Sequence, residues 1–203
     1  MTAIIAIVDD DEAIRISLSS VLRTYGYQTV VFGDATSALD GLRRDKPDCI
    51  VLDVRMPGMD GLTAQRVIAE DPTLPPVIVI TGHADIPMAV RAMKNGAFDF
   101  IEKPIDDELL AKSIAAAVAS HSNMSTSEPQ HSVLMARFEQ LTNREKTVAS
   151  LVSDGYSTAA IAATLEISGR TVDHHRANVL AKMQATSLPQ LLRFLLALSR
   201  RPK

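Results

Sequence analysis

The chain has 203 residues, of which 46% are hydrophobic and 22% are charged, and it carries a formal net charge of −3. This length suits one or two domains, and the composition is that of a soluble globular protein. The single cysteine, Cys49, excludes a disulfide framework and favours a reducing compartment. The sequence also lacks a basic, apolar leader and any run of ~18 apolar residues, so we expect a cytoplasmic protein that does not enter a membrane.

The charge is divided unevenly along the chain. Residues 1–120 hold 11 Lys and Arg against 18 Asp and Glu, whereas residues 138–203 hold 9 against 5. An acidic half repels nucleic acid, and a basic half tolerates it. The stretch between the halves is rich in Ser, contains one Pro and has little to bury, as is typical of a linker. We therefore predict domains at 1–120 and 138–203, with a linker at 121–137.

Short apolar runs alternate with helical segments along the first half. The runs predict strands at 3–8, 28–32, 49–53, 77–81 and 98–102, and the segments predict helices at 12–24, 35–44, 61–70, 86–95 and 106–119. This alternation is typical of a doubly wound α/β fold, in which helices cover both faces of a parallel sheet. Cys49 begins the third strand, where we expect a small, buried apolar side chain.

Polar residues stand at the ends of four of these strands. They are Asp9, Asp10 and Asp11 after the first strand, Asp53 at the end of the third, Thr81 at the end of the fourth, and Lys103 after the fifth. Because a doubly wound sheet binds its ligand at the carboxyl ends of the strands, we expect these side chains to share one pocket. Carboxylates so close together repel one another unless they hold a cation. The set therefore contains the parts of a phosphoryl-transfer site.

The ordered motifs of this half resemble those of a response-regulator receiver domain. The motifs are Val8-Asp9-Asp10-Asp11, Asp53-Val54-Arg55-Met56-Pro57-Gly58-Met59-Asp60-Gly61, Thr81-Gly82-His83 and Lys103-Pro104. Each motif alone is common, but the four in this order and spacing are specific. The resemblance covers residues 1–120 and implies a five-stranded, flavodoxin-like receiver fold.

The resemblance also implies a role for each strand-end residue. Asp53 would be the phosphoacceptor, because an ionised carboxylate attacks phosphorus without a general base. Lys103 and Thr81 would contact the phosphoryl oxygens, and the Lys103–Pro104 peptide bond would be cis. A Mg²⁺ ion would be bound by Asp10, Asp53 and the backbone carbonyl of Arg55, and by Asp9 through a water, with Asp11 a less suitable ligand. The alternative is that Lys103 only neutralises excess acid and that Thr81 only ends a strand.

Phe100 lies on the last strand, where the family has a switch aromatic. If Thr81 moves toward the phosphoryl group, the ring can turn inward to fill the space. The simpler interpretation is a buried core side chain. Residues 56–61 read as a turn that frames the site, with Asp60 capping the following helix.

The second half predicts a helix-turn-helix. Thr142-Asn143-Arg144-Glu145 is a capping box that opens a helix ending at Gly155. Ser157 caps a short helix at 158–165, and Ser168 caps a longer one from 169 to about 184. The tight connection Glu166-Ile167-Ser168 between the last two helices is what a helix-turn-helix requires.

The run from Leu141 to Met183 is similar to the LuxR-type output domain, and most closely to the FixJ branch. The second helix of the pair would then be the recognition helix, with DNA contacts from Arg170, Thr171, Asp173, His174, Arg176 and Lys182; His175 and Asn178 are further polar positions on it. Arg176 is predicted to read a base edge and Lys182 to reach only phosphate. An acid such as Asp173 repels phosphate, so it either accepts from a cytosine amino group or interacts with the positive end of the helix.

Two further features of this half have alternative interpretations. His174 and His175 are adjacent, so they face different directions on a helix, and we expect nucleic-acid contact or solvent exposure rather than metal binding. A final helix at 187–198 carries more leucine than one small core needs. Its apolar residues either form a dimer contact or add to the core; they are Leu188, Leu191, Leu192, Leu195, Leu196 and Leu198.

These features together predict a two-component response regulator. It would accept a phosphoryl group from a sensor histidine kinase on Asp53, form a homodimer through the face of 86–95, 98–102 and 106–119, bind double-stranded promoter DNA and contact RNA polymerase. It would not be a turnover enzyme, because an aspartate-nucleophile phosphohydrolase needs a second acid where Arg55 stands. An RNA-binding antiterminator would lack the helix-turn-helix at 158–182.

Overall fold

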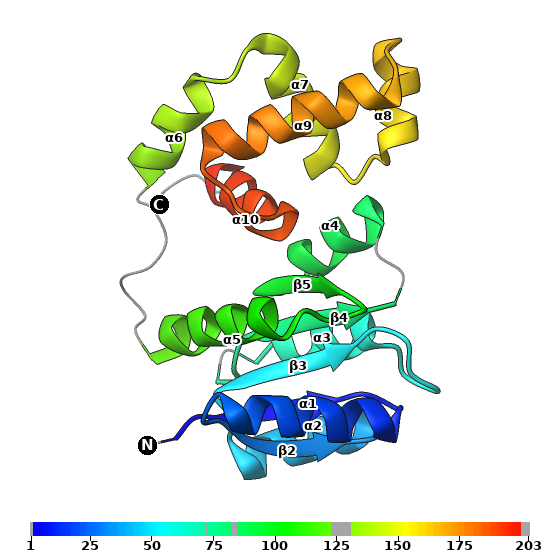
Figure 1. Cartoon of the computed structure of the whole chain (residues 1–203), viewed down its shortest axis with the longest axis vertical. Coiled ribbons are helices and arrows are strands. Elements are labelled where there is room, and N and C mark those ends of the chain that lie inside the picture. Colours follow the sequence, from blue (N-terminus) through cyan, green and yellow to red (C-terminus); the bar gives the residue numbers. More distant parts are fainter. Residues whose placement is uncertain (1, 72, 83–84, 123–130, 200–203) are drawn as a thin grey trace. The chain divides into compact units, whose positions relative to one another are not determined.

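The structure is a computed structural model of the whole chain, and it describes residues 2–71, 73–82, 85–122 and 131–199 (Figure 1). The chain divides into two compact units. The first consists of residues 1–84 and 95–127, and the second of residues 85–94 and 128–203. Helix α4 (Ile86–Lys94) is thereby grouped with the C-terminal helices. Each unit is described below by itself.

A parallel five-stranded sheet forms the centre of the first unit, in the order β2-β1-β3-β4-β5. The order reverses direction between β1 and β3, so the carboxyl ends of these two strands flank the switch point at which doubly wound sheets bind ligands. The predicted flavodoxin-like fold is confirmed. The strands are β1 (Ile4–Val8), β2 (Gln28–Phe32), β3 (Cys49–Asp53), β4 (Val77–Thr81) and β5 (Asp99–Glu102).

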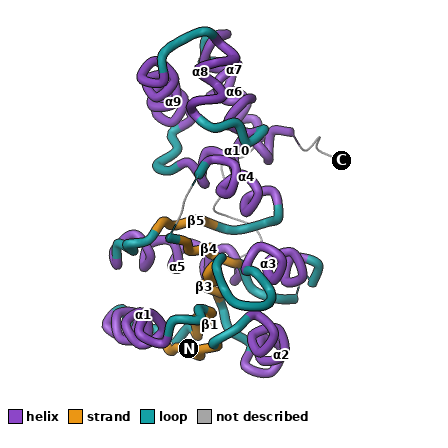
Figure 2. The backbone as a smooth tube through the Cα atoms, turned by 90° about the vertical axis from the view of Figure 1, so that its right-hand side faces the viewer, coloured by secondary structure: helices purple, strands orange, loops and turns teal. Residues whose placement is uncertain are grey.

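Helices cover both faces of this sheet. Figure 2 shows α1 and α5 on one side of the strands and α2 and α3 on the other. The bounds are α1 (Glu12–Thr24), α2 (Ala35–Asp45), α3 (Gly61–Ala69) and α5 (Asp107–Ser122). The first three begin after an aspartate whose side chain accepts a backbone N–H of the first turn: Asp11, Asp34 and Asp60.

The core of the first unit lies between the sheet and its helices. Strands β3 and β4 are buried along their whole length, which is why they read as continuous apolar runs. Cys49 is fully buried, and burial raises the pKa of its thiol, so it is an inert core side chain. Other fully buried members include Ile5, Ile7, Leu22, Ile78, Leu110 and Ile114.

The C-terminal part of the second unit is entirely helical among its described residues. Its helices are α6 (His131–Glu139), α7 (Asn143–Ser153), α8 (Thr158–Leu165), α9 (Gly169–Met183) and α10 (Leu188–Ser199). They share a core of buried residues that includes Leu134, Leu141, Ala149, Val179, Met183, Leu191, Phe194 and Leu195. The bounds of α8 are those predicted, and α7 and α9 begin and end within two residues of the prediction.

Helix α6 differs from the sequence-based prediction, which assigned residues 121–137 to a linker. Leu134 is 1% exposed, and Phe138 packs beside it against the same core, so the segment forms a helix with one buried stripe. At the other end of the predicted linker, α5 continues to Ser122. The remainder of that linker, residues 123–130, lies outside the described residues.

None of the described helices is long and apolar enough to cross a membrane.

Candidate functional site

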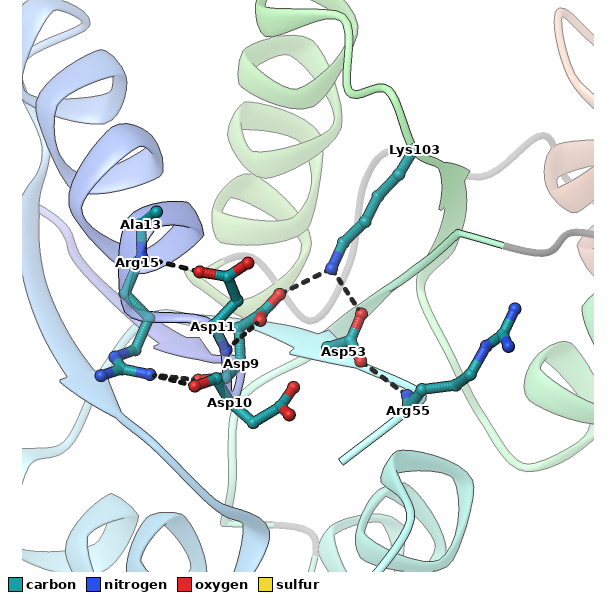
Figure 3. Close-up of polar contacts among 8 residues, drawn as sticks. All are labelled: Asp9, Asp10, Asp11, Ala13, Arg15, Asp53, Arg55 and Lys103. Atoms are coloured by element: carbon teal, nitrogen blue, oxygen red, sulfur yellow. Dashed lines mark hydrogen bonds and ion pairs between the residues drawn. The ribbon is translucent and has the colours of Figure 1, made fainter. Parts of the chain in front are cut away.

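A lysine and two aspartates meet at the switch point of the sheet (Figure 3). The Nζ atom of Lys103 lies 2.7 Å from Oδ1 of Asp53 and 2.7 Å from Oδ2 of Asp9. Asp9 follows β1, Asp53 ends β3, and Lys103 follows β5. The sequence predicted that these strand ends converge, and the geometry shows one cation held between two carboxylates.

The loop after β1 is held by a residue that the sequence did not single out. The Nη1 atom of Arg15 donates to the backbone carbonyls of Asp9 at 2.8 Å and Asp10 at 3.0 Å. The backbone N–H of Asp11 donates to Oδ1 of Asp9 at 2.9 Å, and the Asp11 side chain caps α1 by accepting from Ala13 N–H. Asp9 and Asp11 thus serve local structure, whereas Asp10 is exposed at the same edge (Figure 3).

The ionisation of the site is set by burial and by Lys103. Burial raises the pKa of Asp53 above its usual value, although Lys103 acts in the opposite direction. Burial alone would lower the pKa of Lys103, but Asp53 and Asp9 outweigh it and hold this pKa above its usual value. The charged form of Lys103 is therefore favoured, whereas burial disfavours the charged form of Asp53, a cost that a cation would offset.

The donor set suits a small, hard cation. Among the described residues, no three His, Cys, Asp or Glu side chains are grouped as a complete metal centre. Mg²⁺ does not need such a group, because it binds through one or two carboxylates and keeps several waters. Asp53 and Asp10 provide carboxylate oxygens at one edge of the sheet (Figure 3).

The loop from Val54 to Asp60 is drawn tightly against Asp53. The backbone N–H of Arg55 donates to Oδ2 of Asp53 at 2.6 Å, and Gly61 N–H donates to the Val54 carbonyl at 2.9 Å. A Cβ atom on Gly61 would collide with the backbone carbonyl of Asp53 and would lie 2.9 Å from Val54 Cα. Only glycine fits at the start of α3 while the loop keeps this path.

A Gly61→Ala substitution should therefore displace the loop that packs against Asp53. We expect a loss of stability of about 1–3 kcal/mol from overpacking, together with slower phosphorylation by acetyl phosphate. Thermal melts and a phosphorylation time course would measure both. Gly82→Ala is the matched control, since a Cβ there meets no described atom within 4 Å. Equal behaviour of the two variants would show that the close approach at Gly61 does not hold the loop.

Strands β4 and β5 bring the remaining receiver residues to the site. Thr81 is fully buried, and its backbone carbonyl accepts Lys103 N–H at 2.7 Å. The Lys103–Pro104 bond is cis, as predicted. Phe100 lies beside Val79 of β4 and is 8% exposed. His83, which belongs to the motif after β4, lies outside the described residues.

Helices α8 and α9 form the predicted helix-turn-helix. Ser157 and Ser168 cap the two helices by accepting backbone N–H groups, and Glu166 ends α8 in the left-handed conformation. Residues spaced three or four apart on α9 form its exposed face: Arg170, Asp173, His174, Ala177 and Ala181. Thr171, His175 and Asn178 are half-buried at its margins, and Asn178 contacts His174 at 3.4 Å.

Arg176 and Lys182 are engaged inside the unit. The Nη1 atom of Arg176 donates to Thr158 Oγ1 at 3.2 Å and to Asp173 Oδ1 at 3.3 Å. Lys182 Nζ lies 2.6 Å from Oε2 of Glu145, which is 3% exposed. The sequence identified Glu145 only as part of a capping box, and its pairing with a helix 37 residues away was missed. The sequence carries no signal of this pairing, because the burial of Glu145 becomes visible only in the structure.

Helix α10 contributes to the core of its own unit. Leu191 and Leu195 are buried in that core, and Leu198 packs against it. This packing favours the core interpretation for these leucines over a dimer contact.

Comparisons with known proteins agree with both halves of this description. Residues 5–115 match the family described as response regulator receiver domain, and residues 139–195 match the bacterial regulatory proteins of the luxR family. The chain is 40% identical to the transcriptional regulatory protein FixJ of Bradyrhizobium diazoefficiens, over 93% of this chain and 92% of that protein. It is 41% identical to the response regulator protein TmoT of Ectopseudomonas mendocina, over 94% of this chain and 87% of that protein.

The chain is also similar to solved structures over nearly its whole length. Full-length FixJ from B. japonicum is similar with a TM-score of 0.56 at 39% identity, covering 98% of each chain. The response regulator StyR is similar with a TM-score of 0.57 at 34% identity, covering 97% of this chain and 99% of that one.

Proposed function

Because the chain belongs to the response regulators that join a receiver domain to a LuxR-type DNA-binding domain, we propose that Asp53 is the phosphoacceptor that controls its binding to promoter DNA. The family is one of phosphorylation-dependent transcription factors, with a histidine kinase and DNA as partners, and not of turnover enzymes. The observation that carries the proposal is Lys103, whose ammonium lies 2.7 Å from both Asp53 and Asp9 at the switch point.

The chemistry is transfer of a phosphoryl group to a carboxylate. An oxygen of Asp53 attacks phosphorus in line with the leaving nitrogen of a phosphohistidine; the new O–P bond forms as the N–P bond breaks. Lys103 then pairs with a phosphoryl oxygen in place of the Asp53 oxygen that it contacts now. The Thr81 hydroxyl donates to another phosphoryl oxygen. The backbone N–H of Arg55 stabilises the negative charge on the phosphoryl oxygens in the transition state.

The same residues fit a magnesium site. We assign the ligands as Asp10, Asp53 and the backbone carbonyl of Arg55, with Asp9 bound through a water. Bound Mg²⁺ would neutralise charge on the equatorial phosphoryl oxygens. Asp9 contacts Lys103 directly in this structure, which suits an indirect rather than a direct role at the metal.

Coupling to the output is assigned to Thr81 and Phe100. Movement of Thr81 toward the phosphoryl group opens space on β4, and Phe100 turns into it. The changed receiver then forms a homodimer in the cytoplasm, and the bound dimer contacts RNA polymerase. Residues 1–120 are the receiver domain in this proposal, and the DNA-binding domain extends from α6 to α10.

The output function is binding of double-stranded DNA by the helix-turn-helix. Helix α9 would lie in the major groove, where polar side chains reach base edges and phosphates. The proposed contact residues are Arg170, Thr171, Asp173 and His174, on the exposed face of α9 and at its margin. The sequence also assigned Arg176 and Lys182 to DNA, but these two side chains pair with Thr158 and Glu145 inside the unit. Selection of sequences from a random duplex pool, with and without acetyl phosphate, tests the proposal. Enrichment that requires both phosphodonor and Asp53 is expected, and enrichment independent of both would refute phosphorylation control.

Removal of the receiver gives a second prediction. An acidic receiver that restrains a basic output domain lowers its DNA affinity until phosphorylation. Deletion of residues 1–120 should therefore preserve or increase affinity for the selected duplex, as measured by fluorescence anisotropy beside the unphosphorylated whole chain. Loss of binding by a shortened chain that remains helical would show that the receiver is a required scaffold rather than an inhibitor.

A further inference from the structure

The exposed face of α9 is not a uniformly basic surface. Arg170 and Asp173 place opposite charges on it, and Ala177 and Ala181 are small and apolar. Affinity for phosphates would favour lysine and arginine along such a face. A mixed face is better suited to reading bases, since the major groove presents both donors and acceptors.

Arg176 lies beside this face rather than on it. Its side chain is 25% exposed, against 62% for Asp173, and its Nη1 atom bridges Asp173 Oδ1 and Thr158 Oγ1. The distances, 3.3 and 3.2 Å, are at the long end of the normal range. At these distances the two contacts add little to stability, but they place the guanidinium beside the Asp173 carboxylate.

The helix dipole does not explain why an acidic residue, Asp173, stands on the recognition helix α9. Asp173 is the fifth residue of α9, which begins at Gly169, and the first turn of the helix holds no acidic residue. Because the dipole acts mainly within the first turn, its effect at Asp173 is small. The charged group that contacts Asp173 is the guanidinium of Arg176. Thr158, the first residue of α8, connects this pair to the other helix of the motif.

We propose that Asp173 is a specificity-determining residue, which accepts a hydrogen bond from the exocyclic amino group of cytosine in the major groove. Arg176, braced by Thr158, is the positioning residue that holds the Asp173 carboxylate and offsets its repulsion from phosphate. The inference rests on the proposed DNA-binding function of α9. An ionised carboxylate has about four acceptor sites, so one bond from Arg176 leaves capacity for the base. This assignment replaces the expectation that Arg176 itself reads a base.

The test begins with duplexes selected by the full-length, phosphorylated protein from a random pool. Binding of the wild type and of four variants is then measured on the selected duplex, on each single base-pair change of it and on random duplex. The variants are Asp173→Ala, Asp173→Asn, Arg176→Met and the double variant Asp173→Ala/Arg176→Met. Arg170→Met is the matched control, because it removes an exposed arginine from the same helix but outside the bridge.

We expect Asp173→Ala to lose roughly 5- to 100-fold of discrimination at one C·G pair, and to bind random duplex more tightly because a negative charge is gone. Arg176→Met should relax preference at that same pair, and the double variant should be no worse there than the worse single variant. Asp173→Asn should shift the preference toward adenine, because an amide both donates and accepts. Arg170→Met should weaken binding to all duplexes about equally, leave the preference at that C·G pair unchanged and add to the effect of Asp173→Ala.

Three results would contradict these roles of Asp173 and Arg176. If Arg176→Met acted at a different base pair and its loss added to that of Asp173→Ala, Arg176 would read DNA independently. If Asp173→Ala changed no base preference, the acid would have no part in specificity. If the wild type enriched no sequence at all, the DNA-binding function would fail and the inference with it.

Discussion

Asp53→Asn is expected to abolish phosphorylation by acetyl phosphate while the chain remains folded. Only a carboxylate oxygen can form the acyl phosphate, and the amide keeps the size of the side chain but not its nucleophilicity. Intact-mass spectrometry after incubation with acetyl phosphate and Mg²⁺ measures the product directly. Retention of the phosphoryl group by the variant would refute the assignment and would place the acceptor elsewhere, with Asp9 the next candidate because it shares Lys103.

The same substitution should raise thermal stability at neutral pH. Burial raises the pKa of Asp53 in the folded protein, so its ionised form is less favourable there than in the unfolded chain. The ionised side chain therefore costs stability at pH values above the folded pKa, and that cost disappears as the pH falls below the unfolded value. The melting temperature of Asp53→Asn should exceed that of the wild type at pH 7, and the difference should shrink toward acidic pH.

Two comparisons separate this effect from others. Asp40→Asn removes an exposed acid of α2 and controls for overall charge. Lys103→Met should have the opposite effect and lower stability, because it leaves Asp9 and Asp53 buried together without their cation. An Asp53→Asn variant less stable than the wild type at neutral pH would mean that the Lys103 pair outweighs the cost of burial.

Much of the receiver could be predicted because its signals are local. A run of apolar residues indicates a buried parallel strand, and the polar residue that ends it lies at the site edge by topology alone. Side chains such as Asp60 and Ser157 mark helix starts, since each caps the helix that follows. The convergence of Asp9, Asp53 and Lys103 follows from these facts without any knowledge of their distances.

Features that depend on contacts between distant segments could not be predicted in this way. Helix α6 follows a Ser-rich stretch, and Leu134 is its one side chain buried to a few per cent among the described residues, so its periodicity is too weak to distinguish it from a linker. Arg176 and Lys182 stand on α9 at positions that suit DNA, but their partners Thr158 and Glu145 come from α8 and α7. Sequence spacing identifies a charged side chain, but not the partner that neutralises it.

Lys182 and Glu145 form a tight pair between the first turn of α7 and the last turn of α9. Oε2 of Glu145 accepts Lys182 Nζ at 2.6 Å and the backbone N–H of Thr142 at 2.8 Å. Arg144 donates to the Leu165 carbonyl at the end of α8 and so ties α7 to the motif as well. The pair therefore fixes the recognition helix to the body of the domain. The main role of Lys182 is to position α9, and contact with phosphate is secondary.

Lys182→Met is therefore expected to destabilise the DNA-binding half by about 1–3 kcal/mol, because it leaves a buried carboxylate with an unmet charge. DNA affinity should fall on all sequences in proportion to the loss of ordered α9, while the salt slope of the remaining binding stays unchanged. Arg170→Met is the matched control; it removes an exposed cation of the same helix and should lower the salt slope without affecting stability. Circular dichroism melts and a salt series of anisotropy titrations provide the two measurements.

The pH dependence identifies the partner. Lys182 and the Thr142 backbone hold the pKa of Glu145 at about 2, below its usual value of 4.5. Because the pKa of Glu145 is lower in the folded protein than in the unfolded chain, its ionised form stabilises the fold. This stabilisation is complete above pH 4.5 and is lost as the pH falls toward 2. The wild-type domain should therefore lose stability over this range, and Glu145→Gln and Lys182→Met should each remove much of that dependence. In a double-mutant cycle the two losses should be strongly less than additive. Additive losses, or a reduced salt slope for Lys182→Met at unchanged stability, would instead assign the lysine to phosphate, as its position on α9 first predicted.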